Sequence, residues 1–224
     1  MHFLKKRWLL SAVLAAGLVG LFAGAGFSDE GQPSEEEMMK MFMELAKPGP
    51  GHKAMEPMIG DFDVTSKMWS PGKPEPDESK ATCKAYWVLG GRYAQIEYHG
   101  TFDVAGKPME FDGRGVMAFD NYKKQYQSVW YDSFSTNMMM TTGPAVEPGQ
   151  PIELKGTWDG PMGKIDMRHV YTIESNDKYV MTAYMATPEG EMKHMELTFT
   201  RKQAGAAKAN PRCCPPQKTK GPGY

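Results

Sequence analysis

The stretch "KATCKAYWVLGG", residues 80–91, decides the fold because its side chains alternate with a period of two. Ala, Cys, Ala, Trp and Leu occupy its odd positions, and Lys, Thr, Lys and Tyr occupy its even ones. Successive side chains of a β-strand point to opposite faces, so the pattern predicts a strand with one buried face and one wet face. Gly90 and Gly91 then predict a turn.

The same alternation recurs from Ile59 to Arg201. Short segments rich in Gly, Pro, Asn and Asp, such as "DVAGKP", "DGPMG", "ESND" and "PEG", separate the alternating runs and predict tight turns. About ten short strands at even spacing, with no helix after residue 58, predict an all-β fold. Short connections favour up-and-down order, and closure hides the sheet edges, so we expect an antiparallel up-and-down β-barrel. A barrel of this size has room for side chains and often for one small ligand.

A short helix is expected before the barrel. Ser34 is a good N-cap residue, and Glu37 three positions later completes a capping box. Apolar residues follow at helical spacing and are expected to pack against another part of the protein: Met38, Met41, Phe42 and Leu45. The sequence "PGPG" at 48–51 is expected to end the helix.

The N-terminus has the three parts of a secretory signal. Basic residues 5–7 precede an apolar run from Trp8 to Phe22, and small residues 23–25 follow it. We therefore expect a signal peptide at 1–25, a linker at 26–34, one domain at 35–202 and a disordered tail at 203–224. The protein is expected to be exported, periplasmic or secreted, with no stable membrane anchor after cleavage.

Charge and cysteine content exclude some classes of protein. The net charge is −1 and becomes more negative after signal cleavage, so nucleic acid is not an expected partner. Three cysteines do not make a disulfide scaffold. Cys83 lies in a predicted strand and is expected to be buried. The adjacent Cys213 and Cys214 could bind a metal or form a strained disulfide, but two tail thiols without a site are the preferred interpretation.

The stretch "STNMMMTTG", residues 135–143, raises the question of copper, since thioethers select copper(I) and the chain has 19 methionines. On a strand Met138 and Met140 would share one face and Met139 the other, so a third ligand would have to come from elsewhere. The remaining methionines fall on apolar faces, which favours packing. The histidines lack metal-ligand spacing, and we predict no metal and no cofactor.

The chain resembles a bacterial family of unknown function, the one numbered 1579 among such domains. The resemblance is carried by "PGPGHKAMEPMIGDFDV", "LGGRY", "FDGRGVMAFDNYKKQY" and "VWYDSFST" and covers roughly residues 35–202. It implies a lipocalin-like barrel. The family is also distantly similar to small haem-binding barrels of the nitrobindin type, which carry a histidine near the last strand. Here the first strand lacks their tryptophan, and the alternation around His194 predicts an outward side chain, so haem is not favoured.

The leading functional hypothesis is a non-enzymatic barrel that binds a small apolar or amphipathic molecule in its lumen. The candidate residues for the lumen or its mouth are His52, Trp87, Arg92, Tyr98, Arg114, Trp130, Asp132 and Tyr171. Arg92 and Arg114 could meet a ligand carboxylate or could serve exposed strand faces. No catalytic motif is present, but an enzyme with His52 and Asp132 as acid–base residues remains an alternative, as does a packed structural barrel.

Overall fold

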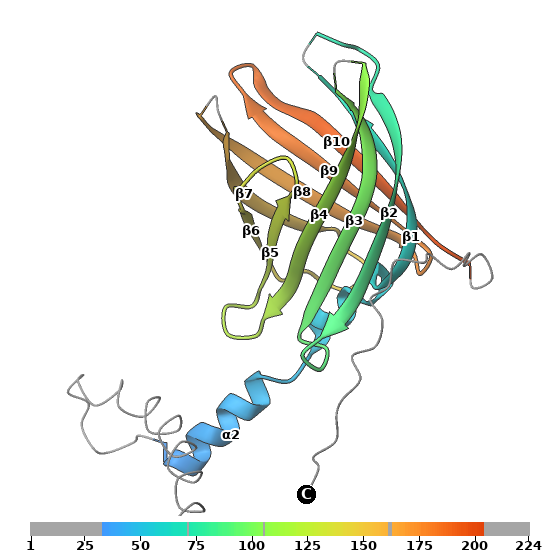
Figure 1. Ribbon diagram of the computed structural model, residues 1–224. Coiled ribbons are helices and arrows are strands. Elements are labelled where there is room, and N and C mark those ends of the chain that lie inside the picture. Colours follow the sequence, from blue (N-terminus) through green and yellow to red (C-terminus); the bar gives the residue numbers. More distant parts are fainter. Residues whose placement is uncertain (1–32, 71, 105, 161–162, 204–224) are drawn as a thin grey trace, which may run out of the picture. The chain divides into compact units, whose positions relative to one another are not determined.

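The computed structural model describes residues 33–70, 72–104, 106–160 and 163–203 (Figure 1). The predicted signal peptide, the linker up to residue 32 and the tail from residue 204, with Cys213 and Cys214, lie outside the described residues.

The predicted all-β barrel is confirmed. Ten antiparallel strands follow one another around a closed barrel, and β1 closes it by pairing with β10 (Figure 1). The strands are β1 (Gly60–Met68), β2 (Asp77–Val88), β3 (Tyr93–Val104), β4 (Lys107–Asp120), β5 (Gln125–Asp132), β6 (Met139–Pro144), β7 (Ile152–Gly160), β8 (Gly163–Ser175), β9 (Lys178–Thr187) and β10 (Gly190–Arg201).

Strand β2 has the predicted alternation. Cys83 and Ala85 are buried, whereas Thr82 and Lys84 between and beside them are exposed. Cys83 lies between Phe62 of β1 and Tyr98 of β3 in the strand register. Burial raises the pKa of the Cys83 thiol to about 12, so the thiol stays protonated inside the barrel wall.

The β3–β4 hairpin extends further than the sequence predicts. The segment 103–108 was expected as a turn, but pairing continues to Val104 and Lys107. The Asp103 carboxylate accepts a hydrogen bond of 2.7 Å from Gly106 N–H and stabilises the tight reversal. Turn residues in the sequence therefore overstate the length of this loop.

The seam between β6 and β7 depends on two glycines. A Cβ at Gly143 would lie 1.7 Å from the Glu153 carbonyl oxygen, and one at Gly156 would lie 2.1 Å from the Met140 carbonyl oxygen. Only glycine allows the two strands to approach so closely here.

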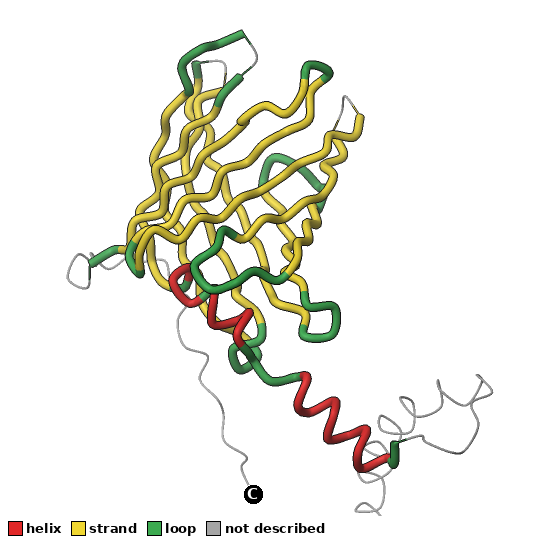
Figure 2. The backbone as a smooth tube through the Cα atoms, turned by 180° about the vertical axis from the view of Figure 1, so that it is seen from behind, coloured by secondary structure: helices red, strands yellow, loops and turns green. Residues whose placement is uncertain are grey.

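One end of the barrel is closed by the segment before β1 (Figure 2). Residues 48–51 were expected only to stop a helix, but Pro50 starts the short helix α3 (Pro50–Ala54), where proline's fixed φ suits the first helical turn. A 3₁₀ turn, η1 (Glu56–Met58), follows. Met55 is 0% and Met58 5% exposed, so this plug seals the end with apolar side chains.

The core next to the plug is aromatic. The rings of Tyr179 and Phe199 stack with centroids 4.2 Å apart, and Phe62 meets Tyr179 edge-on at 5.3 Å. Buried aromatic pairs of this kind contribute about 0.5–1.5 kcal/mol beyond their buried area. This half of the barrel is packed with side chains.

The predicted N-terminal helix is present as α2 (Glu35–Leu45), with its capping box. Ser34 N–H donates to Glu37 Oε2 at 2.8 Å, and Glu37 N–H donates to Ser34 Oγ at 3.2 Å. None of the residues of α2 is buried, and the expected packing of its apolar residues stays a prediction. No helix in the described parts of the chain is long and apolar enough to cross a membrane.

Candidate ligand-binding lumen

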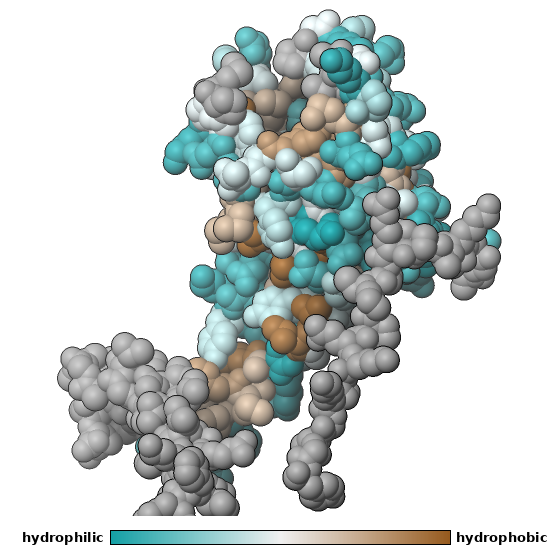
Figure 3. Space-filling view, in the orientation of Figure 1, coloured by the Kyte–Doolittle hydropathy of each residue, from teal (hydrophilic) through white to brown (hydrophobic). Residues whose placement is uncertain are grey.

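The half of the barrel beyond the plug has a different inner wall. Its inward positions nearest the open end are half-buried rather than buried, and hydrophobic side chains are visible at this end among polar ones (Figure 3). Six of these positions are methionines: Met68, Met139, Met167, Met185, Met192 and Met195. In the plug half, by contrast, inward side chains such as Phe62 and Leu154 are 0% exposed. The barrel is thus packed at its base, and its other half has a partly exposed, thioether-rich inner wall, which we call the cup.

His169 lies deep in this cup. It pairs with Leu154 of β7 and Ala183 of β9, both fully buried, and is itself 7% exposed. Burial, with a smaller contribution from the charge of His194, lowers its pKa to about 4. No hydrogen bond from a described residue contributes to that pKa shift. His169 is therefore a neutral, inward-facing imidazole near neutral pH.

The alternation that predicts an outward His194 is interrupted in the structure. The register of β10 shifts between Lys193 and Met195, so His194 occupies a β-bulge. The charge of a protonated His194 lowers the pKa of the inward-facing His169. Burial lowers the pKa of His194, and a hydrogen bond to the backbone of Trp69 partly opposes that shift.

Several side-chain hydroxyl groups lie inside the barrel. Ser66 Oγ and Tyr98 Oη are buried without a hydrogen-bond partner among the described residues. Tyr171 faces inward between Ile152 and Met181, and burial raises its pKa to about 12. An unsatisfied buried hydroxyl costs about 1–3 kcal/mol, so a ligand or water that bonds to these groups would stabilise the protein.

Trp130 forms part of the wall and is held in place by Asp132. Trp130 Nε1 donates to Asp132 Oδ2 at 3.1 Å, and the Trp130 ring meets Tyr98 at a centroid distance of 6.3 Å. The indole covers the backbone of Gly113, where a Cβ would lie 2.2 Å from the ring. Of the residues predicted for the site, the structure brings Tyr98, Trp130, Asp132 and Tyr171 to the inner wall.

His52 and Trp87 belong to the plug instead. His52 is 5% exposed, and its Nδ1 accepts a hydrogen bond of 3.1 Å from Gly49 N–H. Trp87 Nε1 donates to Glu56 Oε2 at 2.9 Å, and its ring lies 6.5 Å from that of His52. Both residues hold α3 and η1 against the strands, at the end away from the cup.

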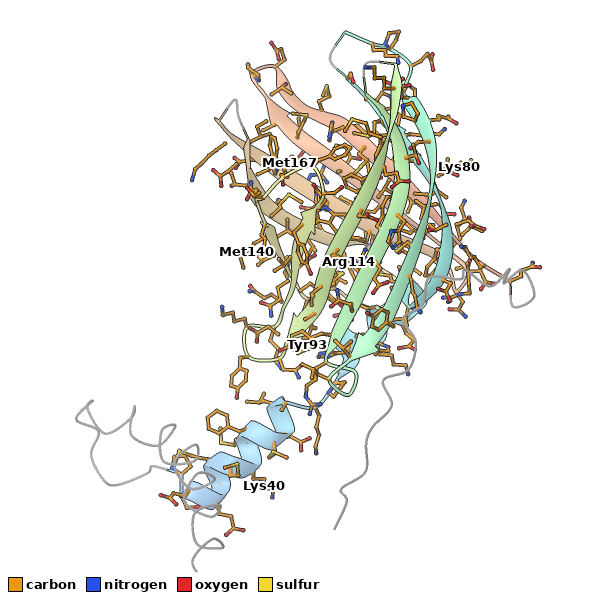
Figure 4. The ribbon with its side chains drawn as sticks, viewed as in Figure 1. Lys40, Lys80, Tyr93, Arg114, Met140 and Met167 are labelled. Atoms are coloured by element: carbon orange, nitrogen blue, oxygen red, sulfur yellow. The ribbon has the colours of Figure 1, made fainter. Side chains whose placement is uncertain are left out.

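The two predicted arginines lie outside the lumen. Arg92 follows the β2–β3 turn and donates to the Leu89 carbonyl at 2.9 Å. Arg114 lies on the outer face of β4 opposite Glu97 of β3 (Figure 4). It borders an external groove of about 870 Å³ over β1–β4. Neither guanidinium is placed to meet a ligand carboxylate inside the barrel.

The methionine triplet does not form a copper site in the way considered from the sequence. Met138 is 64% and Met140 66% exposed, and Met140 lies on the outside (Figure 4). Only Met139 turns inward, opposite Trp130. Within the described ranges, no group of three or more His, Cys, Asp or Glu side chains could hold a metal ion.

Fold and site together define a closed ten-stranded antiparallel barrel with a plugged base and an apolar cup. The chain belongs to the family described as "Protein of unknown function (DUF1579)", whose model matches residues 47–201. No curated protein matches the chain significantly.

Two solved structures are similar in fold. Rv2717c from M. tuberculosis is 15% identical with a TM-score of 0.51, over 70% of this chain and 100% of that chain. The S-type phycobiliprotein lyase CPES from Guillardia theta is 10% identical with a TM-score of 0.43, over 77% of this chain and 99% of that chain. At these identities, the first likeness supports the barrel fold and says nothing of a ligand.

Sequence reasoning missed three features of the cup. His194 was missed because a bulge of one residue leaves no clear signal in the alternation. Ser66 was missed because a serine in an apolar strand looks like any outward polar residue. The methionines of β8, β9 and β10 were noted only as apolar, because their lateral alignment depends on the register, which the sequence does not show.

Proposed function

We propose that the protein is an exported, non-enzymatic barrel that binds a small apolar or amphipathic molecule in the cup. The observation that carries this proposal is the contrast between the two halves: the base is packed, whereas the cup exposes apolar walls and leaves inner hydroxyls such as Tyr98 Oη unpartnered. Partly exposed apolar concavities with a few polar groups are typical of ligand sites.

The charges of the lumen narrow the ligand class. Among the inward positions that the structure describes, charged side chains occur only near the two ends, as with Asp132 at the rim and Arg201 at the base. A carboxylate deep in the cup would be buried without a cationic partner, which is costly. A neutral ligand, or an amphipathic one that leaves its charged end at the rim, suits this wall.

The acid–base alternative loses its support from the geometry. His52 lies in α3 at the base, whereas Asp132 ends β5 at the opposite end. Tyr126, near the base, and Asp132 are six residues apart on β5, which at ~3.3 Å per residue separates the two ends by about 20 Å. Two groups so far apart cannot share a proton in one reaction.

Ligand titration tests the proposal. The mature protein is titrated with a fluorescent fatty alcohol, which is neutral, and with the fatty acid of the same chain length. We expect saturable uptake with a stoichiometry near one, and weaker binding of the acid. Trp130→Ala should weaken binding, whereas Tyr131→Ala, on the outer face of the same strand, should not. No saturable uptake of several neutral apolar probes would reject the cup as a binding site and favour a barrel without ligand.

Export has its own test. Residues 1–25 are proposed to be removed, so the protein purified from its exporting host should begin near residue 26. Intact mass and N-terminal sequencing measure this directly. Recovery of the full-length chain only from the cytoplasm would contradict export. It would not affect the proposal that the cup binds a ligand.

A further inference from the structure

Three methionines of the cup lie in one lateral row. Met167 of β8 pairs directly with Met185 of β9, and Met185 pairs directly with Met192 of β10. All three are half-buried and face the lumen side of the wall. The hydrophobic core cluster and the residues packed against it include none of the three. They therefore do not have the packing role of Met55, Met58, Met117, Met181 and Met195.

Barrel curvature brings such a row together. Adjacent strands lie about 4.8 Å apart, and side chains on the concave face converge toward the barrel axis. A methionine side chain has three rotatable bonds and is long compared with this spacing. Three neighbouring thioethers can therefore direct their sulfur atoms to a single point above Met185.

His194 adds an imidazole beside the row. It follows Met192 by two residues and lies in the bulge of β10. A β-bulge can re-aim a side chain, so this position allows the imidazole to turn toward the row. Imidazole nitrogen is a common ligand of copper.

The donor set selects the metal. Thioether sulfur is a soft ligand and prefers copper(I) to zinc or the hard cations. Among the described residues, no group of three or more His, Cys, Asp or Glu side chains could hold a metal ion, so the donors at this place are the thioethers and the imidazole. Neutral donors in an apolar cup compensate a single positive charge better than a double one.

We propose that Met167, Met185 and Met192, with the imidazole of His194, form a binding site for copper(I). The site differs from the methionine triplet of the β5–β6 region, whose Met138 and Met140 lie outside the barrel. It also does not depend on the proposed apolar ligand, since it uses one wall of the cup rather than its whole lumen.

The test is copper(I) competition with the chromophoric chelator bicinchoninate under anaerobic conditions. All proteins carry Cys213→Ser and Cys214→Ser, because the tail thiols would otherwise bind copper(I) themselves. We expect one copper(I) per chain, with X-ray absorption showing sulfur neighbours and a nitrogen neighbour. Replacement of Met167, Met185 and Met192 by leucine should weaken binding more than about 100-fold, since removal of even second-shell partners costs 10–100-fold.

Two controls keep the result interpretable. The Met138→Leu, Met140→Leu double variant removes two exposed thioethers and should bind copper(I) as the parent does. Met185→Leu alone removes the central sulfur of the row and serves if the triple variant does not fold. Unchanged affinity in the folded leucine variants, or a parent from which bicinchoninate takes all the copper, would overturn the proposal. Uptake of neutral apolar probes is measured on the same variants. A failure of the copper(I) proposal can then be distinguished from a failure of the proposal that the cup binds an apolar ligand.

Discussion

At the scale of single residues, Arg201 shows how one side chain joins segments that are distant in sequence. Its Nη1 donates to the Ile59 carbonyl at 2.7 Å, its Nη2 donates to the Pro57 carbonyl at 3.0 Å, and its Nε donates to the Asn176 carbonyl at 3.0 Å. The guanidinium also lies 4.8 Å from the Phe62 ring centroid. The last residue of β10 thereby fixes the plug to the base of the barrel.

Arg201→Ala should therefore destabilise the whole barrel. Hydrogen bonds from a charged donor contribute about 1.5–3 kcal/mol each, and water replaces part of this, so we expect a loss of about 3 kcal/mol. Arg201→Lys should recover little, because an ammonium group cannot reach three carbonyls at once. Urea unfolding measures both changes. Equal stability of Arg201→Lys and the wild type would show that charge alone matters at this position.

His52 gives the protein a pH dependence of known sign. Burial is the main cause that lowers its pKa below the ordinary 6.5. The unfolded chain then takes up a proton more readily than the folded one, so this part of the stability is fully present above pH 6.5 and is lost as the pH falls through the folded pKa.

His52→Gln tests that sign. Glutamine can still accept from Gly49 N–H and donate to the Arg92 backbone, but it does not titrate. We expect the variant to be about 1 kcal/mol less stable at pH 7.5. The difference from the wild type should shrink as the pH falls to 5, in unfolding curves measured across this range. A constant difference would mean that His52 does not contribute to the acid sensitivity.

At the scale of elements, the strands could be predicted from the sequence, but the positions where side-chain alternation breaks or changes its meaning could not. Alternation gave β2 and the neighbouring strands within a few residues, because burial of one face imposes a period of two. It is interrupted at His194, where the register of β10 shifts. It also could not place Arg114, because a strand pattern does not say which face belongs to the lumen.

The sequence "GRG" at 113–115, too short to count as a motif, has a role that only the fold reveals. A Cβ at Gly113 would lie 2.2 Å from the Trp130 ring, and one at Gly115 would lie 3.0 Å from it. Because neither glycine has a side chain, the indole ring packs directly on the backbone of β4. The role depends on pairing between β4 and β5, which no local pattern encodes.

Gly113→Val should displace Trp130 without opening the base of the barrel. The added methyl groups occupy the ring's position, and displacing the indole also breaks its 3.1 Å hydrogen bond to Asp132. We expect a red-shifted tryptophan emission and a loss of about 1–3 kcal/mol, the usual cost of overpacking. Gly49→Ala, where an added Cβ would lie 3.8 Å from the nearest atom, serves as the control for a glycine without this contact. Unchanged emission in Gly113→Val would contradict the packing of the Trp130 ring on Gly113.

At the scale of the whole molecule, the closed barrel could be predicted, whereas its division into base and cup could not. The strand count and short turns lead to closure because an open sheet would leave an edge unpaired. Which residues fill the interior depends on the register and on the plug, where Met55 and His52 arrive from outside the strand pattern. The candidate site was consequently divided between the two ends, with His52 and Trp87 at the base and Trp130 in the cup.

This division predicts how the chain tolerates truncation. A variant that begins at residue 45 keeps the Leu45 and Lys47 carbonyls, which accept hydrogen bonds of 2.7 and 2.9 Å from Asn121 Nδ2. It loses most of α2, and none of the residues of α2 is buried. Its melting temperature should stay within about 2 °C of the parent, since a change of 1 kcal/mol would shift it by only ~2–4 °C at this size.

A variant that begins at residue 60 is the matched comparison, because it also removes α3 and η1. It loses the buried Met55 and Met58 and exposes the aromatic core at the base. Removal of a large buried apolar side chain costs about 2–5 kcal/mol, so two of them should consume most of the stability of a single domain. We expect this variant to be unfolded or insoluble, as judged by circular dichroism and thermal melting. If instead the shorter truncation at residue 45 already lowered the melting temperature by as much, the apolar face of α2 would have to stabilise the barrel directly.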